Sequence, residues 1–140
     1  MLSKNLNQFR KDKKIFGIGV DIVKKSRIKK LITNKTFIKR IFSKNEITKA
    51  EKIRDKISYF SNRFAAKEAL MKAIGTGFRY NVSFKDISVI NNRLGKPKII
   101  ITNSIIRLLI NRNKLKKIRI FLSLSDEKIY SIAFVIVQKN

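Results

Sequence analysis

The sequence predicts an α+β fold: a single compact domain in which helices pack on a sheet of mostly antiparallel strands. Helical spacing of apolar residues dominates residues 26–74, whereas strand-like segments dominate residues 87–137. The last two strand-like segments are joined by a short polar turn, which is typical of antiparallel neighbours. The length of 140 residues suits one domain with one core.

The first strand is expected near the start of the chain. Residues 1–14 are polar and basic and predict a flexible extension, which leaves residues 15–140 as the domain. Residues 15–20 are apolar and contain two glycines, a pattern that favours a strand with close backbone packing. We expect this strand to end at Asp21.

Helices are expected over the next 60 residues. Apolar residues recur at helical spacing over 26–32 and 37–42, and a capping box at 43–46 begins a further helix. The segment 62–74 is rich in Ala, Leu and Met and ends at Gly75, as helices with a glycine C-cap do. This helix is apolar on nearly all sides, which predicts burial.

The second half of the chain predicts four strands and one helix. Residues 87–90 and 98–102 have strand-like composition, and 105–109 predicts a short helix. Apolar and other residues alternate over 118–124, which indicates a strand with one buried face. Residues 129–137 are nearly all apolar, so we expect a central strand covered on both faces.

The chain is strongly basic. It has 34 Lys and Arg residues against 9 Asp and Glu residues, a formal net charge of +25. Such a charge indicates an acidic partner, and a small nucleic-acid-binding protein is one interpretation. However, Lys, Ile and Asn are abundant along the whole chain, and no nucleic-acid-binding module is recognisable. Only clustered charge therefore indicates a specific partner.

The absence of two residue types narrows the possible chemistry. The chain has no Cys and no His, which excludes disulfide frameworks, zinc fingers, cysteine nucleophiles and histidine-dependent triads. A metal ion would be held by oxygen atoms, which favours magnesium. No signal sequence and no apolar run of roughly 18 residues is evident, so we expect a cytoplasmic protein without a membrane span.

Two acidic residues occupy unusual positions. Glu68 falls among apolar positions of the helix over 62–74, so its carboxylate should be partly desolvated and need a cation. A surface ion pair with Lys72, one turn later, is the simpler interpretation. Asp21 follows an apolar strand, where ligands commonly lie, although a cap of the next helix is the simpler interpretation.

Six motifs in order resemble one known family. They are GIGVDIV (17–23), FSKNE (42–46), RFAAKEALMKAIGTG (63–77), FKDISV (84–89), LGKPKI (94–99) and LSLSDEKIYSIAFVIV (122–137). Together they resemble the holo-acyl-carrier-protein synthase family of bacterial 4′-phosphopantetheinyl transferases, over about residues 15–138. The combination of the first and third motifs is the most specific.

The resemblance implies a fold, an activity and a set of site residues. Members have the 4′-phosphopantetheinyl transferase fold, use magnesium, and transfer the 4′-phosphopantetheine arm of coenzyme A to a serine of acyl carrier protein, releasing adenosine 3′,5′-bisphosphate. It implies that Asp21 and Glu68 bind Mg²⁺ and that Lys72 contacts a phosphate of coenzyme A. Further coenzyme A contacts are implied for Arg63, Gly75, Thr76, Gly77, Lys96 and Pro97, and Lys67 and Arg79 are expected near the pyrophosphate.

The resemblance also implies two protein contacts. Arg27 is expected to bind the acidic carrier protein, helped by neighbouring cations that include Lys24 and Lys30, and a homotrimer with active sites at subunit boundaries is expected. Phe121 stands where many members carry His. Without any His, the base that accepts the serine proton is Glu68 or a water molecule, either on the metal or oriented by Glu68.

Overall fold

The computed structural model describes residues 14–75, 82–115 and 117–139. They form the predicted α+β unit. In chain order the elements are β1 (Lys14–Lys24), α2 (Lys25–Leu31), α3 (Lys35–Ile41), α4 (Lys44–Ala50), α5 (Lys56–Ile74), the 3-10 turn η1 (Phe84–Asp86), β2 (Ile87–Asn91), β3 (Pro97–Ile101), α6 (Asn103–Asn113), β4 (Ile118–Asp126) and β5 (Tyr130–Lys139). Residues 1–13, with most of the predicted extension, and the predicted site residues Thr76, Gly77 and Arg79 lie outside the described residues.

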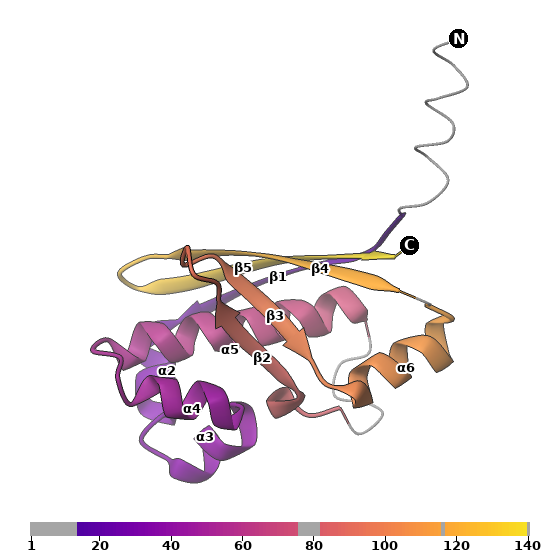
Figure 1. Ribbon diagram of the computed structural model, residues 1–140. Helices are drawn as coiled ribbons and strands as arrows, with labels where there is room; N and C mark the ends of the chain where they lie inside the picture. Colours follow the sequence, from indigo (N-terminus) through magenta and orange to yellow (C-terminus); the bar gives the residue numbers. More distant parts are fainter. Residues whose placement is uncertain (1–13, 76–81, 116, 140) are drawn as a thin grey trace.

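The larger sheet has the strand order β1-β5-β4, and both strand pairs are antiparallel. Helix α5 lies along one face of this sheet, with α2, α3 and α4 near one end of the molecule and α6 at the other (Figure 1). Strands β2 and β3 form a separate antiparallel ribbon. In the described part of the chain, no helix has the length and apolar character that a bilayer crossing requires.

Several local predictions are confirmed. The Ser43–Glu46 capping box begins α4, and α5 ends at Gly75 in the left-handed region with φ +75°.

The prediction that the first strand ends at Asp21 is wrong. β1 continues to Lys24 because its register with β5 runs past Asp21, which pairs with Ala133. Asp21 therefore does not cap a helix, and the N-cap of α2 is Lys24.

The packing of α5 on β1 depends on two glycines. A Cβ atom added at Gly17 or Gly19 would lie 1.9 Å from a carbonyl oxygen of α5, that of Ala73 or Ala69 respectively. Real atoms cannot approach so closely, so only glycine allows this separation of strand and helix. The alanines that face the strand shorten the distance from the helix side as well. The strand that carries Asp21 is thus held directly against α5.

Only one face of the larger sheet is covered. On β5, Ser131, Ala133, Val135 and Val137 face α5 and are buried, whereas Phe134 on the other face is 41% exposed. The prediction that β5 is covered on both faces is therefore wrong for the single chain. The reason is that α5 packs on one side of the sheet only, and no described element packs on the other (Figure 1).

We expect Gly19→Ala to lower the free energy of unfolding by about 2 kcal/mol or more, because the added methyl group would overlap the Ala69 carbonyl. Urea unfolding followed by circular dichroism measures the change. Asn111→Ala, on an exposed position of α6, is the matched control and should change stability by less than about 0.5 kcal/mol. Equal stability of the two variants would contradict the close contact.

Candidate functional site

Asp21 lies on the face of β1 that is turned toward α5. Successive strand residues point to opposite faces, so Asp21 shares its face with Gly19 and Val23, while Val20 and Ile22 are on the exposed side. Its carboxylate is 14% exposed. The strand therefore presents this carboxylate at the junction with the helix.

Glu68 lies on α5 and is half-buried. Burial raises the pKa of its carboxyl group, and the negative charge of Asp21 raises that pKa further, while Lys72 and Arg27 oppose the increase. The repulsion from Asp21 means that the two carboxylates, 47 positions apart in the sequence, share one electrostatic environment. The predicted desolvation of Glu68 is confirmed.

Lys72 supplies a cation to this pair. Its ammonium donates hydrogen bonds to Asp21 Oδ1 at 2.9 Å and to the Val20 carbonyl at 3.0 Å, so it bridges α5 and β1. The simpler interpretation, an ion pair with Glu68 within the helix, is wrong, because the ammonium of Lys72 forms its ion pair with Asp21. The lysine side chain is 54% exposed and can reach a ligand in solvent.

The donor set fits magnesium. Two carboxylates close enough to repel one another favour a shared cation, and Mg²⁺ in enzymes is commonly held by one or two carboxylates together with substrate phosphates and water. No cluster of three or more acidic residues occurs in the described ranges. Asp21 and Glu68 could therefore supply the protein ligands, with the remaining oxygens coming from phosphate and water.

A hollow of about 470 Å³ opens beside Glu68. Arg27 from α2 and Arg40 from α3 line it together with Phe64 and the segment 82–84. The guanidinium of Arg27 lies 6.0 Å from the centre of the Phe64 ring, which favours a fixed orientation. Sequence reasoning missed Arg40, since a basic residue on a helix in so basic a chain gives no signal of its own.

Two predicted phosphate contacts are held inside the fold. Arg63 is 7% exposed, and its guanidinium carbon lies 3.5 Å from the centre of the Tyr59 ring. The guanidinium donates a hydrogen bond to Asn91 Oδ1 at 3.1 Å, whereas its Nε has no hydrogen-bond partner. Lys67 is fully buried and forms an ion pair with Glu46. The expectation that Lys67 lies near the pyrophosphate is wrong, because its side chain leaves α5 on the side of α4 and β2.

The predicted nucleotide contacts are divided in this chain. Gly75 ends α5, whereas Lys96 and Pro97 lie at the β2–β3 turn and line a second hollow of about 260 Å³ with Phe121. This hollow shares no residue with the one beside Glu68. Phe121 is 49% exposed, on the face of β4 away from the core.

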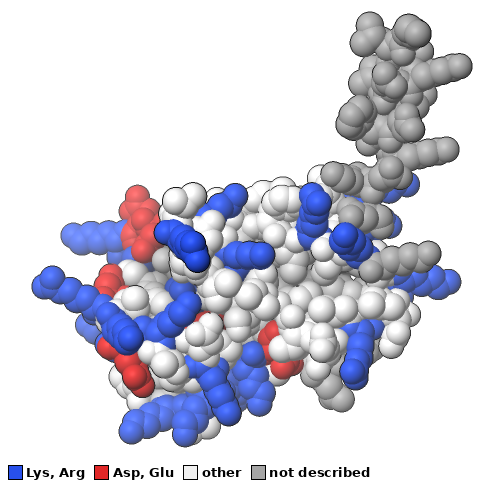
Figure 2. All heavy atoms as spheres, viewed as in Figure 1, with Lys and Arg blue, Asp and Glu red and all other residues white. Residues whose placement is uncertain are grey.

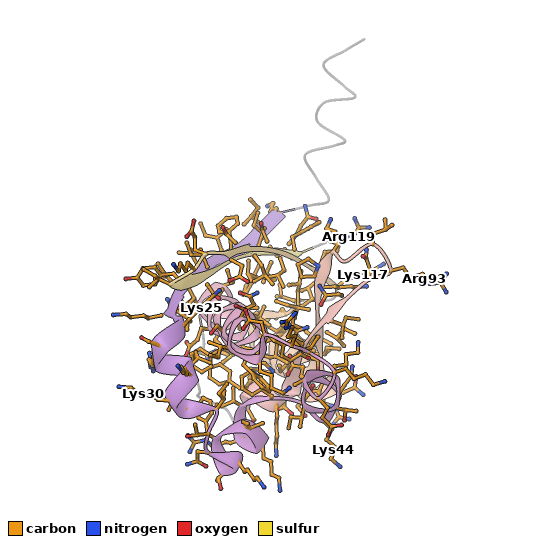
Figure 3. The ribbon with its side chains drawn as sticks, turned by 90° about the vertical axis from the view of Figure 1, so that its left-hand side faces the viewer. Lys25, Lys30, Lys44, Arg93, Lys117 and Arg119 are labelled. Atoms are coloured by element: carbon orange, nitrogen blue, oxygen red, sulfur yellow. The ribbon has the colours of Figure 1, made fainter. Side chains whose placement is uncertain are left out.

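Only some of the basic side chains that follow Asp21 are free to bind a partner. Lys24, Arg27 and Lys30 are exposed, and Lys30 points away from α2 in Figure 3. Lys25 is instead held by Asp126 and by the Ser58 hydroxyl. Across the face shown in Figure 2, cationic side chains are widely scattered, so net charge alone does not mark a site.

Comparison with known proteins shows the family of this chain. A family model described as the 4′-phosphopantetheinyl transferase superfamily matches residues 17–134. The chain is 57% identical over 127 residues to a holo-[acyl-carrier-protein] synthase of Pelagibacter ubique, covering 91% of this chain and 99% of that protein.

Two solved structures are also similar. The holo-[acyl-carrier-protein] synthase of Neisseria meningitidis matches with a TM-score of 0.80 and 36% identity, over 89% of this chain and 98% of that one. The enzyme of Bacillus anthracis in complex with CoA (3′,5′-ADP) matches with a TM-score of 0.75 and 34% identity, over 90% and 98%. By sequence and by structure, this chain belongs to the 4′-phosphopantetheinyl transferase superfamily.

Proposed function

We propose that this protein is a holo-acyl-carrier-protein synthase, which transfers 4′-phosphopantetheine from coenzyme A to a serine of apo acyl carrier protein. The serine oxygen forms a bond to the phosphorus of the arm, the pyrophosphate bond breaks, and adenosine 3′,5′-bisphosphate leaves. The observation that carries the proposal is the meeting of Asp21, Glu68 and Lys72 at the α5–β1 junction, in a chain that belongs to this superfamily.

The chain's own residues have three tasks in this reaction. Asp21 and Glu68 hold Mg²⁺, which when bound neutralises the charge of the pyrophosphate. Lys72, exposed and already at the carboxylates, contacts a phosphate oxygen. Arg27 and Arg40 attract negative groups to the hollow. Glu68, or a water molecule that it orients, accepts the serine proton, because the chain has no histidine.

The carrier protein docks on α2. Exposed cations on this helix lie next to the hollow beside Glu68, which Arg27 itself lines, so an acidic partner bound there would bring its serine to the carboxylates. The remaining positive charge of the chain, including residues 1–14, is background without a specific partner. A location in the cytoplasm stays a prediction from the sequence.

Assembly into a homotrimer would complete the site. The uncovered face of the larger sheet is apolar, with Ile18, Val20 and Ile22 on β1 and Phe134 on β5 all more than 40% exposed. Such a face favours contact with another copy of the chain. In a trimer, the turn with Lys96 and Pro97 from one copy would meet the Asp21–Glu68 site of its neighbour, which accounts for the separation of these residues within one chain.

We expect the protein to add one phosphopantetheine mass to apo acyl carrier protein when coenzyme A and Mg²⁺ are present, measured by mass spectrometry. Asp21→Asn and Glu68→Gln should each lower the rate by about 100-fold or more, because each removes charge that balances the metal and the phosphates. Absence of any transfer, where a known synthase succeeds, would refute the function. Nanomolar, steeply salt-dependent binding of nucleic acid would then favour the nucleic-acid-binding interpretation.

We expect Phe134→Lys to shift the protein from trimer to monomer, since the replacement places charge in the centre of the apolar face. Size-exclusion chromatography with light scattering measures the mass. Ile100→Lys, at a 47% exposed strand position of β3, is the matched control and should leave the mass unchanged. A wild-type monomer, or a trimeric Phe134→Lys variant, would contradict this interface.

We expect Lys30→Glu to raise the KM for the carrier protein by about 3- to 10-fold without changing the KM for coenzyme A, because a like charge would face the acidic partner. Lys117→Glu is the charge-matched control, at the side of the molecule opposite Lys30 in Figure 3. Equal KM values for the two variants would argue against docking on α2.

A further inference from the structure

Lys67 is a charged residue in a fully buried position. Its side chain is 0% exposed, and its ammonium donates to Glu46 Oε2 at 2.8 Å, to the Phe84 carbonyl at 3.0 Å and to the Ile87 carbonyl. An ammonium has three N–H donors, so these acceptors satisfy all of them. Acceptors from α4, η1 and β2 thus hold the Lys67 side chain in one orientation.

Glu46 extends this network. Its Oε2 atom also accepts from the Ser43 N–H at 2.9 Å, and its Oε1 atom accepts from the Val89 N–H at 2.8 Å. The Tyr59 hydroxyl donates to the Glu46 carbonyl at 2.8 Å. The carboxylate therefore ties the start of α4 to β2, and Lys67 ties both to α5.

Glu68 follows Lys67 directly on α5. Neighbouring residues on an α-helix point about 100° apart, so the direction of Lys67 determines the direction of Glu68. On the other side of the helix, the glycines of β1 fix the distance between α5 and the strand that carries Asp21. The glycines set this distance, whereas the three hydrogen bonds of the Lys67 ammonium set which side of α5 faces α4 and β2.

Stability alone does not require this ion pair. Burying two charges is costly, and apolar side chains of similar volume often stabilise a core as well or better. Because the pair lies one residue from Glu68, we propose that Lys67 is a positioning residue, whose buried ammonium sets the rotation of α5 and so aims Glu68 at the metal site beside Asp21. This inference rests on the proposed function of Glu68 and Asp21.

The absence of cysteine from the chain permits a sharp test. Lys67→Cys creates a single thiol, which is alkylated in urea before refolding. Bromoethylamine gives an S-aminoethyl side chain, nearly identical to lysine, and iodopropane gives a neutral S-propyl side chain of the same size. The two forms differ only in the ammonium group. Unmodified wild type carried through the same refolding, and Lys56→Met at the exposed start of α5, are the controls.

Three readouts are compared at a temperature where circular dichroism shows both forms folded. We expect the S-aminoethyl form to behave as wild type, and the S-propyl form to have a kcat about 10- to 100-fold lower. Binding of Mn²⁺ in the presence of coenzyme A, followed by electron paramagnetic resonance of free Mn²⁺, should weaken in the S-propyl form. The KM for the carrier protein should not change, because α2 is untouched.

Equal kcat and equal Mn²⁺ affinity of the two forms would overturn the positioning role. If the S-propyl form folds poorly, the S-aminoethyl and S-propyl forms are both prepared again in a chain that carries Glu46→Gln. This substitution removes the carboxylate that S-propyl leaves without a cation, and kcat and Mn²⁺ affinity are compared as before. Wild type without transferase activity would refute the proposed function, whereas active wild type with indistinguishable S-aminoethyl and S-propyl forms would refute only the role of Lys67.

Discussion

The close contact between the backbones of β1 and α5 positions both the sheet and the candidate site. Two glycines let the strand approach within a distance that any Cβ atom would forbid, since it would meet a helix carbonyl at 1.9 Å. The strand is also paired to β5, so the whole sheet follows its position. The same contact brings Asp21, from the strand, to Glu68 and Lys72, from the helix. Packing and chemistry thus share one cause.

Charge is divided between two sides of α5. On the side of β1, two carboxylates lie near one exposed ammonium, an arrangement that a phosphate-bound divalent cation would complete. On the side of α4 and β2, Lys67 and Glu46 form a buried ion pair. Helix α5, although mostly apolar, can carry both sets of charged side chains because each set contacts an oppositely charged group on a different neighbouring element. Burial of the second pair gives the first a rigid support.

In a single copy of the chain, one apolar face is uncovered and two groups of predicted site residues are separate. Assembly of several copies would account for both. The apolar outer face of the sheet is uncovered, and the turn with Lys96 and Pro97 lines a hollow separate from that of Glu68. An oligomer that buries the first can complete the second. Cationic side chains are scattered over the face shown in Figure 2, whereas Arg27 of α2 and Arg40 of α3 line the hollow beside Glu68.

Local periodicity and motif order were enough to predict five features from the sequence: the α+β class, the capping box at the start of α4, the end of α5 at Gly75, the one-sided alternation of β4 and the family. The local sequence pattern marked Glu68 and Asp21 as unusual, but it could not show that they lie near one another. Three features became visible only in the folded chain: Asp21 lies within a strand, Lys72 pairs with it, and Lys67 is buried against Glu46. Helical spacing shows which residues share a side of α5, but the element that packs on each side depends on contacts between segments distant in the chain.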